Sequence, residues 1–188
     1  MVYIPVLMSS LVVGITINWM FSQEYGLVNF IIRSLGGTAL EWSLNPRLAT
    51  FVIAFASVWA SIGFNMILYI GGINSISNDL YEAATIDGAS GVQAFFRITV
   101  PMLAPTTFMV VLLSTVNLLK EYALVQGITQ GGPGLSTTFI IQYIFDKGFN
   151  QMQYGYASAI STVVMIIFAL IAFAQFLSLI HISEPTRH

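Results

Sequence analysis

The chain has 188 residues, of which 56% are apolar and only 7% are charged, and its net charge is −2. Ordinary soluble domains carry roughly 25% charged residues, so this composition leaves too few polar side chains for a water-exposed surface and favours a membrane protein. The absence of cysteine excludes disulfides, thiolate metal sites and cysteine nucleophiles. The small net charge gives no indication of a nucleic-acid partner.

Four charge-free apolar runs of membrane-spanning length follow one another along the chain. A helix needs about 20 apolar residues to cross the hydrocarbon core. Backbone groups in lipid must be paired within the segment, so we expect helices rather than open strands. A signal peptide is a poor alternative for the first run, which has no basic region before it. The predicted spans cover residues 1–21, 48–71, about 101–119 and about 154–180.

The three connections between these spans differ in character. The connection 22–47 contains an apolar stretch that suits a short helix at the membrane interface. The connection 72–100 carries acidic residues. The connection 120–153 contains a Gly-Gly-Pro-Gly turn at 131–134, followed by a second candidate interfacial or re-entrant helix at 137–149.

The connection 72–100 predicts a helix, a tight turn and a second helix. Asn78 or Asp79 is placed to cap the first helix, and Gly88 suits a left-handed C-cap. A second helix is expected at about 90–98, and Pro101 suits the first turn of the next span. From the residues alone, an amphipathic interfacial loop between two helices is the favoured interpretation of this segment.

The same stretch resembles the EAA motif, E-A-A-x3-G-x9-I-x-L-P, of ABC importer permeases, with Val100 in place of the leucine. In that family the loop forms a coupling helix that docks into a cytoplasmic ATPase. The resemblance therefore implies an ATPase-coupling role for seven residues: Glu82, Ala83, Ala84, Asp87, Gly88, Ile98 and Pro101.

Most of the chain is similar to the sugar branch of this family, the maltose- and glycerol-phosphate-type permeases. The stretches that carry this similarity include 24–29, 129–133 and 154–159. The family implies an all-α, polytopic permease bundle with six spans, of which the last four are expected here. We expect a truncated permease domain at 1–177 and a non-native tail at 178–188, because the family pattern stops near Leu177.

The resemblance also implies the partners. They are a cytoplasmic ABC ATPase dimer, a second permease subunit, an extracytoplasmic solute-binding protein and a sugar-like solute, in the bacterial inner membrane with its lipid. No nucleic acid is expected. The chain itself is not expected to be an enzyme or to hold a cofactor, since ATP would bind to the partner and no G-x-x-x-x-G-K-[ST] phosphate loop is present.

A polar helix face is the candidate solute pathway. Ser114, Asn117 and Glu121 are spaced i, i+3 and i+7 in and after the third span, and hydroxyl and amide groups both donate and accept hydrogen bonds. Asn65 and Tyr69 of the second span are one turn apart and are candidates to join this face. Helix–helix hydrogen bonding is the alternative role, and it is favoured for Asn65.

The membrane orientation of the chain and its function class each have an alternative. The motif places the loop 72–100 in the cytoplasm, whereas the positive-inside rule opposes it, since Arg33, Arg47, Lys120 and Lys147 lie on the other side. A membrane enzyme lacks support because the spans hold no ionisable cluster. The coupling motif disfavours an exporter or channel. An importer permease for amino acids, peptides or oxyanions is the nearest alternative to a sugar permease.

Overall fold

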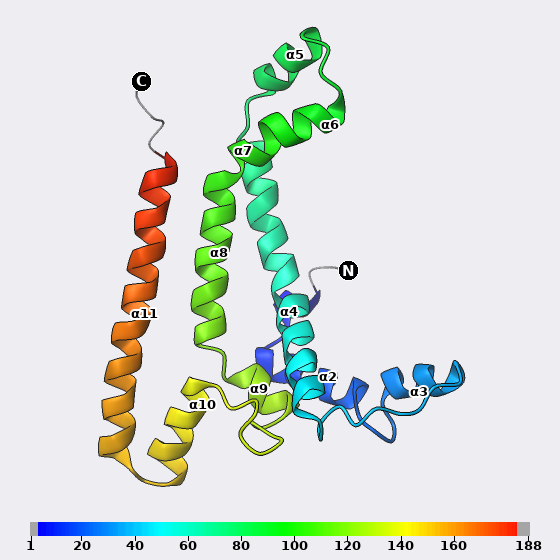
Figure 1. The fold of residues 1–188 in the computed structure, drawn as a ribbon, viewed down its shortest axis with the longest axis vertical. Coiled ribbons are helices and arrows are strands. Elements are labelled where there is room, and N and C mark those ends of the chain that lie inside the picture. The colour runs from blue at the N-terminus through cyan, green and yellow to red at the C-terminus, as the bar shows by residue number, and fades with distance from the viewer. Residues whose placement is uncertain (1–3, 184–188) are drawn as a thin grey trace. The chain divides into compact units, whose positions relative to one another are not determined.

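The computed structural model describes residues 4–183, which form helices joined by turns and loops, without a strand in that range (Figure 1). The predicted all-α class is therefore confirmed. Of the predicted non-native tail at 178–188, residues 184–188 lie outside the described residues.

Two helices are long and apolar enough to cross a membrane by themselves within the described part of the chain. Helix α4, Pro46–Asn74, has 29 residues, and helix α11, Tyr154–Ser183, has 30 residues. At 1.5 Å per residue both exceed the hydrocarbon thickness of about 30 Å. They confirm the second and fourth predicted spans and extend each by a few residues.

The third predicted span is bent rather than straight. Helix α7, Val100–Met102, is followed after Leu103 by helix α8, Ala104–Leu119, and the two segments that meet there form an angle of 57°. Pro105 explains the break, because its ring nitrogen has no hydrogen to donate to the carbonyl of Pro101 four residues earlier. If this bent pair counts as one span, the described residues contain three.

The first predicted span forms a shorter helix than expected. A single turn, α1 at Ile4–Leu7, is followed by α2 at Ser10–Met20, an apolar helix of 11 residues. The Ser9 side chain accepts a hydrogen bond from the Val12 N–H and so begins a new helix inside the apolar run. At 11 residues α2 rises only about 16 Å, roughly half of the hydrocarbon thickness.

Shorter helices occupy the connections. Helix α3, Leu27–Ser34, forms where the first connection predicted an interfacial helix. Helices α5, Asn78–Ile86, and α6, Gly91–Ala94, form in the second connection. Helices α9, Ala123–Ile128, and α10, Ile140–Phe145, form in the third connection, and α10 continues into a π-helical turn at Asp146–Asn150.

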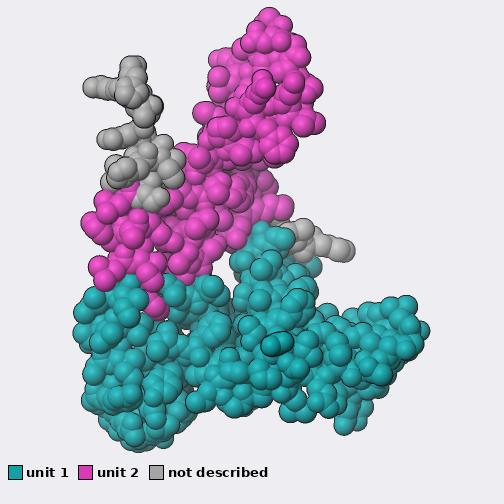
Figure 2. Space-filling view, in the orientation of Figure 1, with its two compact units in different colours: residues 1–63, 117–167 teal, residues 64–116, 168–188 magenta. Residues whose placement is uncertain are grey.

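The chain divides into two compact units (Figure 2): unit 1 contains residues 1–63 and 117–167, and unit 2 contains residues 64–116 and 168–188. In unit 1, helix α2 packs closely against α9. Gly14 and Gly127 face each other at this crossing, where a Cβ on Gly14 would lie 2.7 Å from the Leu124 carbonyl oxygen. The crossing belongs to a buried apolar cluster formed by Val13, Ile17, Phe21, Trp42, Val52, Ile53, Ala56, Leu124, Val125 and Ile128.

Asn29 of α3 is the polar centre of unit 1 and is fully buried. Its Nδ2 donates to the carbonyl oxygens of Gln23 and Leu40, at 3.1 and 3.0 Å. Its Oδ1 accepts from the Leu40 N–H and from the Trp42 indole N–H, both at 3.0 Å. A buried amide needs such partners, and this one joins α3 to the segment that leads into α4.

In unit 2, helix α8 is linked by hydrogen bonds to parts of α4 and α11. The Tyr69 hydroxyl of α4 donates to Thr107 Oγ1 at 3.3 Å, and Gln175 Nε2 of α11 donates to Thr115 Oγ1 at 3.1 Å. Polar contacts of this kind replace the hydrophobic driving force that helices lack when they associate within lipid.

Candidate functional site

The connection between α4 and α8 folds as the sequence predicts, as a helix, a tight turn and a second helix. Helix α5 begins at Asn78, and its N-cap is Ser77, one residue before the first predicted cap, because the Ser77 side chain accepts a hydrogen bond from the Asp79 N–H at 3.3 Å. Asp79 instead lies in the first turn, where its negative charge is favourable toward the helix dipole.

Gly88 ends α5 in the left-handed conformation, with φ at +73°. The Ala89 N–H donates to the Ala84 carbonyl at 2.9 Å, and the Gly88 N–H donates to the Thr85 carbonyl at 3.1 Å. This pair of hydrogen bonds is the Schellman motif. No heavy atom lies within 4 Å of the place of a Cβ on Gly88, so the backbone conformation, and not lack of space, requires glycine here.

The second helix begins with a capping box. The Ser90 side chain accepts from the Gln93 N–H, and the Gln93 side chain accepts from the Ser90 N–H at 2.8 Å. Helix α6 then runs through a π-helical turn, Phe95–Thr99, into α7. Ile98 lies on this turn and Pro101 lies in α7.

One hydrogen bond ties the two helices of the connection together. The Tyr81 hydroxyl of α5 and the Thr99 hydroxyl lie 2.8 Å apart. Thr99 is buried, and Tyr81 is half-buried. The connection is therefore a defined helix-turn-helix unit and not an open loop.

The outward surface of this unit combines acidic and apolar side chains. Glu82, Ala83 and Asp87 are exposed, and Ala84 is half-buried. Ile86 is 85% exposed, and Val92 and Phe96 are 68% and 65% exposed. Small residues allow close approach of another backbone, the carboxylates offer charge to a basic partner, and the exposed apolar side chains offer area to bury.

Of the three residues predicted to form a polar face on the third span, only two lie on its helix. Ser114 and Asn117 both lie on α8, half-buried and exposed respectively. Glu121 does not share that helix face, because α8 ends at Leu119. Its carboxylate instead accepts from the Leu124 N–H at 2.9 Å, since the first N–H groups of α9 have no intrahelical partner.

Other polar residues of the spans have defined places. Asn65 lies half-buried on α4, and Tyr69, one turn later, contacts Thr107 of α8. Gln175, which the sequence reasoning did not single out, contacts Thr115 in the same unit. A single amide in the apolar run of α11 was the available signal.

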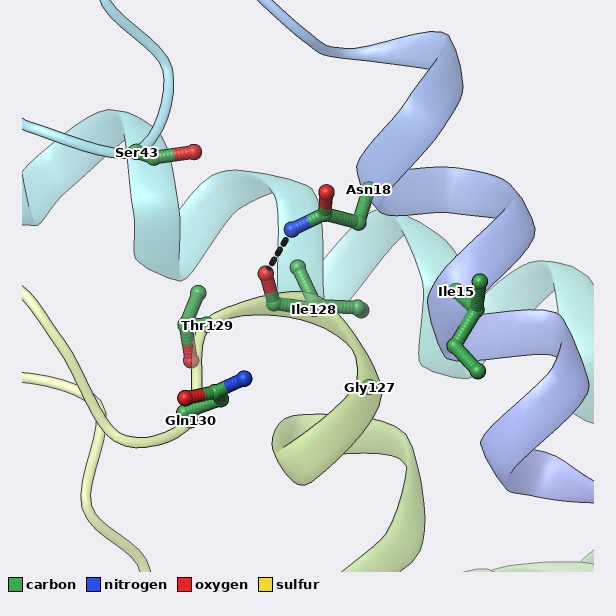
Figure 3. A pocket seen from close by; sticks show the side chains of 7 residues that line it. All are labelled: Ile15, Asn18, Ser43, Gly127, Ile128, Thr129 and Gln130. Atoms are coloured by element: carbon green, nitrogen blue, oxygen red, sulfur yellow. Dashed lines mark hydrogen bonds between the residues drawn. The ribbon is translucent and has the colours of Figure 1, made fainter.

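A polar pocket of about 360 Å³ lies in unit 1 (Figure 3). It is bounded by α2, by the segment before α4, and by the end of α9 with the turn that follows. The Asn18 amide donates to the Ile128 carbonyl across this space. The lining residues are Ile15, Asn18, Ser43, Gly127, Ile128, Thr129 and Gln130.

Comparison with known proteins places the chain among transport proteins. Residues 1–181 match the family model of binding-protein-dependent transport system inner membrane components. The chain is 36% identical over 166 residues to the trehalose/maltose transport system permease protein MalF of Thermococcus litoralis, covering 88% of this chain and 56% of the relative. It is 32% identical over 171 residues to the sulfoquinovosyl glycerol transport system permease protein SmoG of Agrobacterium fabrum, covering 91% and 55%.

Two solved structures share the fold. One, a bacterial ABC transporter for import of the acidic polysaccharide alginate, superposes with a TM-score of 0.88 at 24% identity, covering 97% of this chain and 64% of that chain. The other, a bacterial alginate ABC transporter in complex with an alginate pentasaccharide-bound periplasmic protein, gives 0.76 at 26% identity, covering 97% and 62%. The chain spans 55% to 60% of the length of the curated relatives it matches.

Proposed function

Because the chain belongs to the family of binding-protein-dependent transport system inner membrane components, we propose that it acts as the permease subunit of an ABC importer for sugars or related solutes. The family consists of multi-pass components of the bacterial inner membrane and is not an enzyme family. The resemblance to sugar-importer permeases seen in the sequence is confirmed by the relatives that match.

The helix-turn-helix unit between α4 and α8 carries the proposal. Its motif residues lie on two helices and on the turn at Gly88 that joins them. The hydrogen bond between Tyr81 and Thr99 holds these helices together. Its exposed carboxylates and apolar side chains, Ile86 above all, lack cover from the described chain. Docking of this surface into a cytoplasmic ATPase dimer would transmit closure of the ATPases to α8, which follows α7 directly.

The names of the matching relatives support a sugar or a related solute as the transported molecule. They include permeases of transport systems for trehalose and maltose, lactose, arabinooligosaccharides and sn-glycerol-3-phosphate. Each of these solutes carries at least two hydroxyl groups, and sn-glycerol-3-phosphate carries a phosphate as well. A second permease subunit and an extracytoplasmic binding protein complete the proposed importer. Asn65, Ser114 and Asn117 are the proposed solute-pathway residues, and a role for Glu121 stays a prediction.

The proposal fixes the orientation of the chain. Helix α4 is long enough to cross the membrane, and in the proposed importer it does so, which puts the segment before Pro46 and the segment after Asn74 on opposite sides. The coupling surface must face the ATPase in the cytoplasm. The basic residues Arg33 and Arg47, which precede or begin α4, are then extracytoplasmic, against the positive-inside count.

Single cysteines test this arrangement cleanly, because the chain has none of its own. The test variant is Ile86→Cys, at a position that is 85% exposed and outside the matched motif residues. The matched control is Leu44→Cys, 63% exposed and just before α4. A membrane-impermeant maleimide is added from either side of sealed vesicles, with and without the purified ATPase subunit of a maltose-type importer.

We expect Ile86→Cys to label only from the cytoplasmic side and the ATPase to protect it. Leu44→Cys should label only from the opposite side and be indifferent to the ATPase. Labelling of Ile86→Cys from the outer side would overturn the orientation. Cytoplasmic labelling that the ATPase does not slow would overturn the docking role of this surface.

A further inference from the structure

The pocket of unit 1 has the chemistry of a site for a neutral, hydroxyl-rich molecule. None of its seven lining residues is charged, and four of them, Asn18, Ser43, Thr129 and Gln130, have polar side chains. Its volume of about 360 Å³ falls at the lower end of the range of roughly 300–1,000 Å³ that small-molecule sites occupy. Without a cation in the wall, a phosphate or carboxylate would lack its usual partners.

Three of these side chains, all on exposed residues at the open side of the pocket, have hydrogen-bonding capacity that the protein does not use and that water or a ligand can take up. The Ser43 hydroxyl, the Gln130 amide and the Asn18 Oδ1 make no hydrogen bond within the residues whose side chains are described, 4–177. The Thr129 hydroxyl, by contrast, is engaged with Thr137 at 2.8 Å. The Ser43 hydroxyl and the Gln130 amide can each donate and accept a hydrogen bond, and the Asn18 Oδ1 can accept one. Alcohol groups of a ligand also donate and accept, so they match this set.

Gln130 has a backbone conformation that is unfavourable for a residue with a side chain. Gln130 has a φ of +53°, a conformation that glycine or asparagine usually adopts at a helix C-terminus. Its N–H donates to the Val125 carbonyl at 3.0 Å, which fixes the turn after α9. Figure 3 shows the Gln130 amide, the Ser43 hydroxyl and the Asn18 amide around the same space. Gln130 is exposed, so its free amide alone indicates nothing; the positive φ of a non-glycine residue beside the pocket is the observation from which a binding role follows as a hypothesis.

We infer that this pocket is a binding subsite for a neutral sugar on the extracytoplasmic side of the chain, separate from the α8 residues of the proposed pathway. The inference rests on the proposed function for its orientation, because Ser43 precedes the membrane-crossing α4 and the coupling surface follows it. The subsite takes a sugar before it enters the membrane pathway, through Gln130, Ser43 and Asn18.

The experiment uses Ile15→Cys, which places a label in the pocket wall without removing a polar group. Its rate of reaction with a maleimide is measured in membranes at increasing concentrations of maltose, trehalose, lactose and inorganic phosphate. Tyr25→Cys, at an exposed position that does not line the pocket, is the control. At least one neutral sugar should slow labelling of Ile15→Cys in a saturable manner, while phosphate should not, and no probe should slow Tyr25→Cys.

Two further substitutions in the Ile15→Cys background assign the effect to the pocket. Gln130→Gly removes the amide and relieves the positive φ, so it preserves folding, and Ser43→Ala removes one hydroxyl. Each should raise the half-protecting sugar concentration by about 2- to 10-fold, as expected for one lost neutral hydrogen bond. Ser136→Ala, which removes an exposed hydroxyl outside the pocket, should leave it unchanged.

The inference is wrong if Ile15→Cys is inert to the maleimide, if no neutral sugar protects it, or if phosphate protects it as well as sugar does. It is also wrong if Gln130→Gly and Ser43→Ala leave protection unchanged. Failure of the proposed function shows separately, in the sidedness and ATPase protection of Ile86→Cys. A sugar-protected pocket with an Ile86→Cys that the ATPase does not protect would overturn the docking role of the coupling surface and leave the subsite.

Discussion

The crossing of α2 and α9 makes a quantitative prediction for Gly14→Ala. The new Cβ would lie 2.7 Å from the Leu124 carbonyl oxygen and 3.0 Å from the Gly127 Cα. Ordinary van der Waals contact begins at 3.4 Å, so the first of these distances is about 0.7 Å too short. Both neighbours are backbone atoms and cannot rotate away. The helices must therefore separate within the buried cluster that includes Val13 and Val125.

The magnitude follows from two opposing contributions. Overpacking a well-packed core costs about 1–3 kcal/mol, whereas alanine in place of glycine favours a helix by up to about 1 kcal/mol. The difference between the two is about 0–2 kcal/mol, and because the atoms in contact are backbone atoms that cannot rotate away, we expect the upper half of this range, a free energy of unfolding lower by about 1–2 kcal/mol. For a chain of this size that corresponds to a melting midpoint lower by about 2–8 °C.

The assay is thermal unfolding in detergent, measured as the fraction that remains monodisperse after heating. Gly71→Ala is the matched control, because it is also a helical glycine and no heavy atom lies within 4 Å of its Cβ position. The control should be neutral or slightly stabilising. A Gly14→Ala midpoint equal to or above that of the parent would refute the close crossing of α2 and α9.

Three further predictions concern polar and backbone features. Gly88→Ala should destabilise the end of α5 by about 1 kcal/mol, because φ there is +73°, and hydrogen exchange of the α5 amides should accelerate. Asn29→Leu should cost about 3 kcal/mol, because it removes the partner of the buried Trp42 indole N–H and of both backbone groups of Leu40, while the Gln23 carbonyl keeps Arg33 as a donor; the emission of Trp42 should shift to longer wavelength. Tyr81→Phe should cost about 1 kcal/mol through the lost contact with Thr99, measured as faster proteolysis of the connection 72–100.

Matched substitutions separate these effects from general damage. Gly88→Asn should restore most of the α5 protection, since asparagine tolerates the left-handed conformation. Asn150→Leu removes an exposed amide of the same type and should be nearly neutral. Equal losses for Asn29→Leu and Asn150→Leu would contradict the central role of Asn29. Protection of α5 amides that does not change in Gly88→Ala would contradict the Schellman turn.

Local chemistry made the coupling connection predictable from sequence. A glycine that requires positive φ, as at Gly88, and a serine–glutamine capping box, as at Ser90, act over a few residues. The exact start of α5 was missed by one residue, because Ser77, Asn78 and Asp79 all have suitable side chains and only the folded geometry selects Ser77.

Hydrophobic length made α4 and α11 predictable, since lipid thickness imposes a minimum run of apolar residues. The same rule overestimated α2 and did not locate the bend before α8. In those places a capping side chain, Ser9, and a missing donor, Pro105, interrupt the helix inside an apolar run. The end of α8 before Glu121 was missed for a related reason, because a carboxylate satisfies free N–H groups at the start of α9.

The sequence by itself determined the membrane class, the long helices and the coupling motif, because length, composition and turn chemistry are read along the chain. Only the tertiary structure decided which distant groups meet. Asn18 and Ile128 are 110 positions apart, yet their contact spans the pocket, and Gly14 meets Gly127 where α2 crosses α9. Such pairings depend on how α2 packs against α9, and no periodicity in either helix encodes its partner.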